Sequence, residues 1–398
     1  MTSTTERTLS VGVVGLGMAG NAMVRAMKEY PVVSMVAGAD VRPELRDRFA
    51  EDFGARPYAS AESLVADPAI DVVYIATPHQ FHKEHAIAAV RNGKHVILEK
   101  PLALTLEDCD EIIAAVEASG VHFVVGHTES YAPSIRKMRE LIASGQLGRL
   151  AMINAWHYND FLYRPRRPEE LDTSKGGGIL FNQTPHQVDV IRLLGGGLLR
   201  SVRAYTGILD AKRPTEGSCL AFLEFEDGAA ASIVYSGYDH FDTRELHTWL
   251  SAEQQKQPNQ YGQTRRALST VSGPEEEASL RVSRYAYGMG GFPVSAQQPH
   301  FGLTVVTCEN GDMRPWADGV AVYTDEGRRE IAVEQGRGLP GRGEVIDEMY
   351  DAIVYGKPLV HTPRWAKATL EVALGILQSS RERREVTLRH QVPTPSGV

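Results

Sequence analysis

Three glycines at fixed spacing constrain this chain more than any other feature. Gly15, Gly17 and Gly20 directly follow the apolar run from Leu9 to Val14 and open a segment with helical spacing. The first glycine permits a tight turn, the second lets the backbone approach a pyrophosphate, and the third lets the helix pack closely on the strand. The pattern predicts the first strand, turn and helix of a Rossmann domain.

The segments that follow alternate in the way that βαβ units do. Strands are expected at 9–14, 32–40, 72–76, 95–99 and 122–125, with helices at about 18–30, 43–53, 81–92 and 106–119. Pro43 suits a first helical turn, Gly93 and Gly120 suit helix C-termini, and Thr105 with Asp108 resembles a capping box. We therefore expect an α/β fold with a doubly wound parallel sheet over residues 1–126.

A different pattern begins after residue 126. Longer alternating runs at 150–158, 202–207, 218–225 and 229–236 predict a mostly antiparallel, open sheet in an α+β domain over residues 127–398. Asp227-Gly228 is a strong hairpin signal between two of these runs. Residues 251–298 are rich in Gln, Ser, Gly and Arg and are expected to form a loop insertion. A helix at 363–380 is expected to pack back on the first domain.

Composition narrows the classes of function. Lysine and arginine number 42 against 50 acidic residues, so the net charge of −8 offers no general attraction for nucleic acid or an anionic membrane. The apolar runs are strand-sized, the N-terminus lacks a signal-peptide pattern, and Cys109, Cys219 and Cys308 form no pair of metal-ligand or disulfide spacing. We expect a cytoplasmic protein that acts on a small molecule.

An acidic residue follows the glycines at the spacing that a nicotinamide dinucleotide requires. Asp40 lies 20 residues after Gly20, at the end of the second expected strand. A carboxylate at this place accepts hydrogen bonds from the ribose hydroxyls and repels the 2′-phosphate of NADP. NAD is the expected cofactor. Arg42 leaves two interpretations open, since it either accommodates a 2′-phosphate or lies in solvent at the helix start, stacked on adenine.

Three histidines recur at intervals of three residues. His79, His82 and His85 lie where a strand gives way to a helix, a spacing that can bring metal ligands together. No HExxH motif is present, and this edge of the sheet is where a cofactor passes. We therefore favour cofactor-loop or surface histidines and expect no metal.

Two further segments carry candidate catalytic groups. Glu99-Lys100-Pro101 ends a parallel strand, where ligands bind in open α/β sheets, although a surface lysine beside a turn proline explains it equally well. In the segment 176–189, Asn182, His186 and Asp189 have the spacing of one helix face. That polar stripe either lines a site or holds a structural histidine.

Together these segments resemble a known family. The glycine pattern, Ala76-Thr77-Pro78 with His82, the run 93–101 and the glycine-rich segment ending in His186 are similar to the glucose-fructose oxidoreductase, inositol dehydrogenase and rhizopine catabolism (Gfo/Idh/MocA) oxidoreductases. The resemblance covers almost the whole chain. Residues 159–168, Phe181-Asn182-Gln183 and 299–302 resemble the phthalate 4,5-cis-dihydrodiol dehydrogenases and related enzymes of carboxylated arene dihydrodiols within that family.

This resemblance implies an activity and a set of residues. It implies that Lys100 and His186 flank the reacting carbinol, His186 as general base and Lys100 as a donor to the same oxygen. Asn182 stands where an aspartate is frequent; it orients His186 or binds substrate but supplies no negative charge. The expected cofactor contacts are Gly15, Gly17, Met18, Ala19, Gly20, Asp40, Arg42, Thr77, Pro78, His82, Glu99 and Lys100. The expected substrate contacts are Tyr158, Phe161, Tyr163, Arg164, Arg166, Arg167, Gln183 and His300.

Several functions remain open at this point. The first is NAD-dependent oxidation of a carboxylated arene cis-dihydrodiol to a catechol, in which one arginine of Arg164, Arg166 and Arg167 holds the carboxylate. The second is a sugar, inositol or glycoside dehydrogenase. A redox-neutral lyase or hydrolase that uses NAD transiently and a non-enzymatic NAD-binding protein are the others. A homo-oligomer, dimer or tetramer, is expected in each case.

Overall fold

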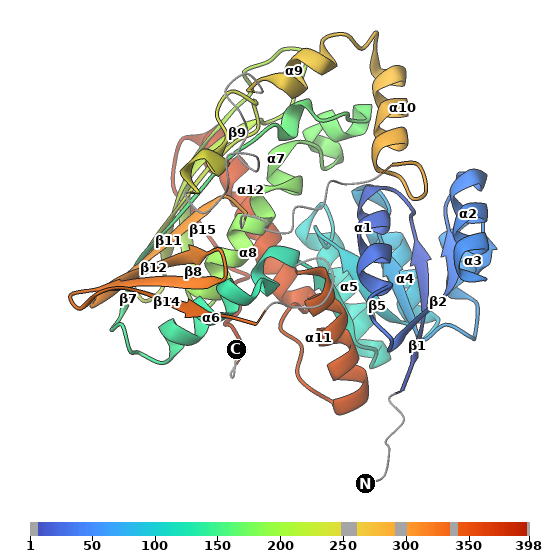
Figure 1. The fold of residues 1–398 in the computed structure, drawn as a ribbon, viewed down its shortest axis with the longest axis horizontal. Coiled ribbons are helices and arrows are strands. Elements are labelled where there is room, and N and C mark those ends of the chain that lie inside the picture. The colour runs from blue at the N-terminus through green and yellow to red at the C-terminus, as the bar shows by residue number, and fades with distance from the viewer. Residues whose placement is uncertain (1–6, 248–260, 291–300, 335–340, 396–398) are drawn as a thin grey trace. The chain divides into compact units, whose positions relative to one another are not determined.

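The computed structural model describes residues 7–247, 261–290, 301–334 and 341–395 (Figure 1). The chain divides into two compact units, and neither is one continuous segment. The first contains residues 1–128, 282–292 and 336–367, and the second contains residues 129–281, 293–335 and 368–398.

The first unit contains a parallel sheet. Its described strands are β1 (Leu9–Val14), β2 (Val33–Ala39), β3 (Arg56–Tyr58), β4 (Val72–Ile75), β5 (His95–Glu99) and β6 (Phe123–Gly126), in the order β3-β2-β1-β4-β5-β6. Its helices are α1 (Met18–Met27), α2 (Pro43–Phe53), α3 (Ala61–Val65), α4 (His82–Arg91), α5 (Leu106–Ser119) and α11 (Arg342–Tyr355). This strand order is that of dinucleotide-binding sheets, whose ligands lie at the carboxyl ends of the strands.

Local sequence explains where these elements begin and end. Pro43 occupies the first turn of α2, the Thr105 hydroxyl accepts a hydrogen bond from the N–H of Asp108, and Gly120 ends α5 in the left-handed conformation. These end signals are confirmed. Helix α1 ends at Met27 rather than Tyr30, and a short 3-10 turn, His79–Phe81, precedes α4. The sequence analysis did not predict β3, α3 or α11.

The second unit contains a mostly antiparallel sheet in which β7 and β10 pair in parallel. Its described strands are β7 (Leu150–Tyr158), β8 (Leu199–Gly207), β9 (Ser218–Phe225), β10 (Ala230–Ser236), β11 (Leu303–Cys308), β12 (Gly311–Trp316), β13 (Gly319–Thr324), β14 (Gly327–Ala332) and β15 (Val386–Thr387). Their order is β14-β13-β12-β11-β7-β10-β9-β8-β15. The hairpin at Asp227-Gly228 is confirmed, with Gly228 at a φ of 87°.

Helices cover one face of this second sheet. Helix α8 (Thr184–Leu194) packs on β7 and β10, and α6 (Pro133–Ala143) packs on β12 and β13. Along β7 and β9 the alternate residues that face away from these helices are exposed, and they include Met152, Trp156, Leu220 and Phe222. This alternation is typical of an antiparallel sheet with one face packed on helices.

Two sequence expectations about the second domain are wrong. The stretch 251–298 is not a plain loop, because its described part holds α9 (Gln263–Leu268) and α10 (Pro274–Tyr285). A proline and three glutamates open α10 and Arg284 closes it, which suits the helix dipole.

The remaining α-helices of the described residues are α7 (Gly178–Asn182) and α12 (Pro363–Glu382). Asn182 and His186 do not share one helix, since Gln183 interrupts the path before Pro185, which lacks the N–H that a continuous helix needs.

Candidate active site

The glycine loop after β1 has the geometry of a phosphate-binding turn. Gly15 has a φ of 92°, and a Cβ there would lie 2.7 Å from the carbonyl oxygen of Ala76. A Cβ at Gly20 would lie 2.0 Å from the carbonyl oxygen of Gly15, whereas at Gly17 it would meet nothing within 4 Å. The outer glycines therefore permit close packing, and the middle one leaves open space beside the backbone.

The first turn of α1 is suited to an anion. Gly17 caps the helix without a side-chain hydrogen bond, and no acidic residue lies in the first turn, which begins with Met18 and Ala19. The initial N–H groups of a helix have no partner within it and carry the positive end of its dipole. Together with the open space at Gly17, this turn fits the pyrophosphate of NAD.

Asp40 ends β2 next to this loop and is held on both carboxylate oxygens. Oδ2 accepts hydrogen bonds from the N–H of Leu16 at 2.9 Å and from Arg42 Nη2 at 3.1 Å, while Oδ1 accepts from the N–H and Nε of Arg42. Burial raises the pKa of Asp40, but the Arg42 bonds and charge and the Leu16 N–H hold it below its ordinary value. The carboxylate is therefore ionised at neutral pH and already pairs with Arg42.

His82 joins the loop after β4 to the loop after β5. Its ring is fully buried, with Nδ1 2.7 Å from the carbonyl oxygen of Pro101 and Nε2 3.0 Å from that of Thr77. Burial lowers the pKa of His82, so the neutral ring donates its single proton to one of these oxygens at a time. Pro78 begins the turn between them, and His85 pairs with the Thr77 hydroxyl through Nδ1.

Glu99 and Lys100 lie at the carboxyl end of β5. The Glu99 carboxylate is buried and accepts hydrogen bonds from the Tyr74 hydroxyl at 2.7 Å and from Arg342 Nη1 at 2.9 Å. Burial raises the pKa of Glu99, but the charges of Arg342 and Lys100 and the Tyr74 hydroxyl hold it below its ordinary value. Lys100 thus lies between Glu99, which is held by Tyr74 and Arg342, and Pro101, whose carbonyl oxygen is 2.7 Å from His82 Nδ1.

In the second unit, His186 lies in an aromatic environment near the start of α8. Its side chain is buried, and its ring centroid is 5.0 Å from that of Phe301. The same phenylalanine ring contacts His157 of β7 at 4.2 Å. Burial and the nearby Arg164 charge lower the pKa of His157 to about 3, so this second histidine is neutral at physiological pH.

A chain of polar groups surrounds these rings. The Tyr235 hydroxyl of β10 lies 2.9 Å from Asn159 Oδ1 and 3.1 Å from Gln183 Oε1, and Asn159 Nδ2 lies 3.2 Å from His157 Nε2. We define Gln183, His186, His157, Asn159, Tyr235 and Phe301 as the His186 cluster. Asn182 lies in α7, and its amide donates to the carbonyl oxygens of Gly176 and Gly178, which fixes the glycine-rich segment.

The three candidate arginines lie in different surroundings. Arg166 is 3% exposed, stacks 3.8 Å over Phe161 and bonds to the Phe161 carbonyl and Glu170. Arg167 pairs with Glu169 and Glu170. The Arg164 side chain is 37% exposed, pairs with Asp160 at 2.8 Å, and acts electrostatically on both His157 and Tyr235.

The other predicted substrate residues are dispersed. Tyr158 packs against Phe241, and the Tyr163 hydroxyl donates to Asp210 rather than lying in the His186 cluster. His300 lies outside the described residues. The sequence predicted no role for His157, Tyr235 or Phe301, although Phe301 lies within the segment 299–302 that carries the family resemblance. For His157 and Tyr235 the available signal was their position on β7 and β10, on the covered side of the sheet.

Comparison with known proteins decides the family. A model described as "Oxidoreductase family, NAD-binding Rossmann fold" matches residues 9–127, and a model of the GFO/IDH/MocA C-terminal domain matches residues 135–253. A Comamonas testosteroni protein named 1-carboxy-3-chloro-3,4-dihydroxycyclo hexa-1,5-diene dehydrogenase is 41% identical over 380 residues, which is 94% of this chain and 95% of that protein.

The chain belongs to the Gfo/Idh/MocA oxidoreductases. It is an NAD-dependent oxidoreductase. A crystal structure from Bordetella bronchiseptica RB50 is similar with a TM-score of 0.89 and 47% identity, covering 96% of this chain and all of that one. Levoglucosan dehydrogenase in complex with NADH and levoglucosan shares the fold, with a TM-score of 0.74 over 96% of this chain and all of that one, at 20% identity.

The described residues include neither a membrane-spanning helix nor a cluster of metal ligands. No helix there is long and apolar enough to cross a bilayer. No group of three or more His, Cys, Asp and Glu side chains in that part of the chain is arranged to hold a metal ion. His79, His82 and His85 lie in that part, and both ring nitrogens of His82 face backbone carbonyl oxygens, at 2.7 and 3.0 Å.

Proposed function

We propose that this oxidoreductase converts a carboxylated arene cis-dihydrodiol to the corresponding catechol. The observation that carries the proposal is the similarity to the Comamonas testosteroni dehydrogenase over nearly the whole length of both chains. The aromatic walls of the His186 cluster and the position of Arg164 support the same class of substrate. A carboxylated diene requires apolar walls and a guanidinium, whereas a polyol requires many hydrogen-bonding groups.

Each proposed catalytic residue has one task. His186 accepts the proton of the substrate hydroxyl, and Lys100 donates a hydrogen bond to the oxygen on which negative charge develops. Bound NAD would supply the acceptor for the hydride that leaves the carbinol carbon. The resulting hydroxyketone tautomerises to the aromatic catechol, which makes the oxidation favourable. Burial of His186 beside Phe301 limits water around the proton acceptor.

Arg164 is the proposed partner of the substrate carboxylate. Arg166 is buried with its guanidinium on Phe161 and Glu170, and Arg167 faces Glu169 and Glu170. The side chains of Arg164 and Arg167 are similarly exposed, at 37% and 35%, but Arg164 is the one that acts electrostatically on His157 and Tyr235 of the His186 cluster. A planar guanidinium already oriented by Asp160 suits bidentate contact with a carboxylate.

The experiment compares a carboxylated cis-dihydrodiol with the same diol lacking the carboxylate. We expect NADH and a catechol from the first, and a KM that rises by about tenfold or more for the second, because one charge-assisted contact is lost. Arg164→Gln should give the same increase with the carboxylated substrate, while Arg167→Gln serves as the control. Equal kinetics for both diols would overturn the proposal.

We also propose that the chain forms a homo-oligomer through the uncovered face of its second sheet. Trp156, Phe222 and Leu220 are about half exposed on that face, an arrangement that favours a protein partner over water. Light scattering after size-exclusion chromatography tests this, with Trp156→Glu expected to shift the protein toward monomer. A monomeric wild-type protein at micromolar concentration would contradict it.

A further inference from the structure

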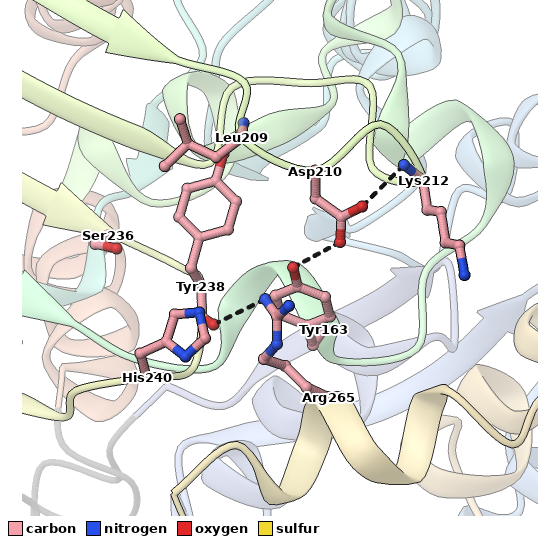
Figure 2. Close-up of a pocket in the computed structure, with 8 residues that line it drawn as sticks. All are labelled: Tyr163, Leu209, Asp210, Lys212, Ser236, Tyr238, His240 and Arg265. Carbon is pink, nitrogen blue, oxygen red and sulfur yellow. Dashed lines mark hydrogen bonds between the residues drawn. The ribbon is translucent and has the colours of Figure 1, made fainter.

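A pocket in the second unit lies apart from the His186 cluster. It has a volume of about 490 Å³ and is lined by Tyr163, Leu209, Asp210, Lys212, Ser236, Tyr238, His240 and Arg265 (Figure 2). Ser236 of β10 lines it, whereas its neighbour Tyr235 bonds to Asn159 and Gln183 in the cluster. Successive residues of a strand point to opposite faces, so the pocket and the cluster lie on opposite sides of β10.

The pocket holds the guanidinium of Arg265, which acts electrostatically on Asp210 but forms no ion pair with any described residue. Arg265 of α9 stacks 4.1 Å from the centroid of the Tyr163 ring and donates from Nη1 to the carbonyl oxygen of Tyr238 at 3.3 Å. Within the described residues this is its only side-chain hydrogen bond, and it forms no ion pair. A guanidinium has five N–H groups, so four of them remain for a ligand.

The charges around the pocket favour an anion. Lys212 and His240 lie on opposite sides of it in Figure 2, and neither forms an ion pair within the described part of the chain. Asp210 is the one carboxylate among the lining residues, and its two oxygens accept hydrogen bonds from the Tyr163 hydroxyl at 2.7 Å and the Lys212 N–H at 2.9 Å. With Asp210 ionised, the two permanent cations leave one net positive charge.

The remaining walls favour a ligand with an apolar body. The Tyr238 hydroxyl donates to the carbonyl oxygen of Gly207 and accepts from the N–H of Leu209, and the Tyr163 hydroxyl is held by Asp210. Both phenols thus use their polar ends on the protein, which leaves aromatic faces and the Leu209 side chain as walls. The volume lies within the range of about 300–1,000 Å³ typical of small-molecule sites.

We propose that this pocket is a binding site for a small ring-bearing carboxylate, held by Arg265 with Lys212 and His240 around it. The site goes beyond the proposed reaction, because it lies on the other side of β10 from His186 and needs neither NAD nor turnover. Its ligand is a monoanion whose ring packs on Tyr163 and Tyr238.

Calorimetric titration of the full chain with benzoate tests the proposal. The titration is done on the Arg164→Gln variant, so that the proposed substrate contact contributes nothing. We expect benzoate to bind, and Arg265→Gln in that background to weaken binding by about tenfold or more, the loss expected for a charge-assisted contact. Arg266→Gln is the matched control, since Arg266 lies next along α9 and its Nη1 bonds to the Tyr261 carbonyl; it should change affinity less than twofold.

A second variant covers the case in which Arg265→Gln disturbs α9. Lys212→Gln removes a charge from an exposed side chain that forms no ion pair with the described residues, so the fold should persist by circular dichroism while benzoate affinity falls about threefold. No benzoate binding, or equal losses for Arg265→Gln and Arg266→Gln, would overturn the site. Because the readout is binding without NAD, a failure here is distinct from a failure of the dehydrogenase proposal.

Discussion

The two units build their sites from different materials. The first uses backbone: Gly15, Gly17 and Gly20 and the start of α1 form an anion-binding turn within a few residues. The second uses side chains from β7, β10, α8 and residue 301, which the sheet brings together from distant parts of the sequence. Substitutions in the first should therefore affect cofactor binding, and those in the second turnover or substrate affinity.

The largest expected effect comes from His186. His186→Ala should lower kcat by about 10²-fold or more, the usual range for a general base, while NAD affinity stays within about twofold. Steady-state kinetics and a fluorescence titration with NADH measure the two quantities. His390→Ala, at an exposed histidine of the same unit, is the control. A comparable loss of NAD affinity would contradict the proposal that cofactor binding depends on the first unit and turnover on the second.

The glycine loop offers the converse test. Gly20→Ala places a methyl group against the Gly15 carbonyl, so it should lower both the melting temperature and NAD affinity, the latter by about tenfold or more. Gly17→Ala has open space around its Cβ and should leave the melting temperature unchanged while weakening NAD binding. Thermal unfolding with and without NAD separates the two. If Gly17→Ala binds NAD normally, the pyrophosphate does not pass this residue.

Stability distinguishes the arginines of the second unit. Arg166→Gln should lower the free energy of unfolding by about 3 kcal/mol, because it leaves Glu170 buried with one cation fewer. Arg167→Gln, at a side chain that is one-third exposed, should change it by about 0.5 kcal/mol or less. Urea denaturation measures both. If both variants lost a similar free energy of unfolding, burial would not explain how much each arginine stabilises the fold.

The preference for NAD over NADP tests the role of Asp40 in the first unit. Asp40→Ala should narrow the ratio of kcat/KM for NAD over NADP, because it removes the carboxylate that repels a 2′-phosphate and releases Arg42 from its ion pair. The wild-type protein should prefer NAD. Kinetics with both cofactors supply the ratio, and a wild-type protein that reduces NADP as efficiently as NAD would contradict the role given to Asp40.

A further effect concerns the pH dependence of stability, through His157. With a pKa of about 3 in the folded state, His157 stays neutral where an unfolded histidine takes up a proton. Its contribution to stability is complete above the unfolded pKa of about 6.5 and declines as the pH falls toward 3. His157→Gln should therefore lose less stability than the wild type between pH 6.5 and 4. Urea denaturation at each pH gives the free energy of unfolding of both proteins. If the two values fell in parallel with pH, the His157 ring would not be buried in its neutral form.

The same contrast explains what the sequence can predict. The glycine loop, the Pro43 helix start and the Asp227-Gly228 hairpin depend on neighbouring residues, and all three occur as expected. Pro185 does lie in the first turn of α8, but the regular spacing of Asn182 and His186 does not reveal that a separate helix, α7, ends just before it. The contacts of Phe301 with His157 and His186 depend on how β11 pairs with β7, which no local pattern encodes.

The individual roles of clustered arginines are particularly difficult to predict from sequence. Arg164, Arg166 and Arg167 look alike in sequence, yet one side chain is 37% exposed, one is buried and one is bound to two glutamates. Their neighbours Glu277 and Arg281 come from α10, more than a hundred residues away. Charge alone therefore predicts a cluster, and only the fold assigns each member its surroundings.

The proposed reaction is the NAD-dependent oxidation of a carboxylated arene cis-dihydrodiol. The most direct measurement is kcat/KM with NAD, followed by NADH absorbance, for such a dihydrodiol beside myo-inositol and levoglucosan. We expect the dihydrodiol to yield NADH and an equal amount of catechol carboxylate. Its kcat/KM should be at least about 10²-fold higher than that of either polyol, because a polyol lacks the charged contact and the apolar fit. NADH from a polyol and none from the dihydrodiol would contradict it.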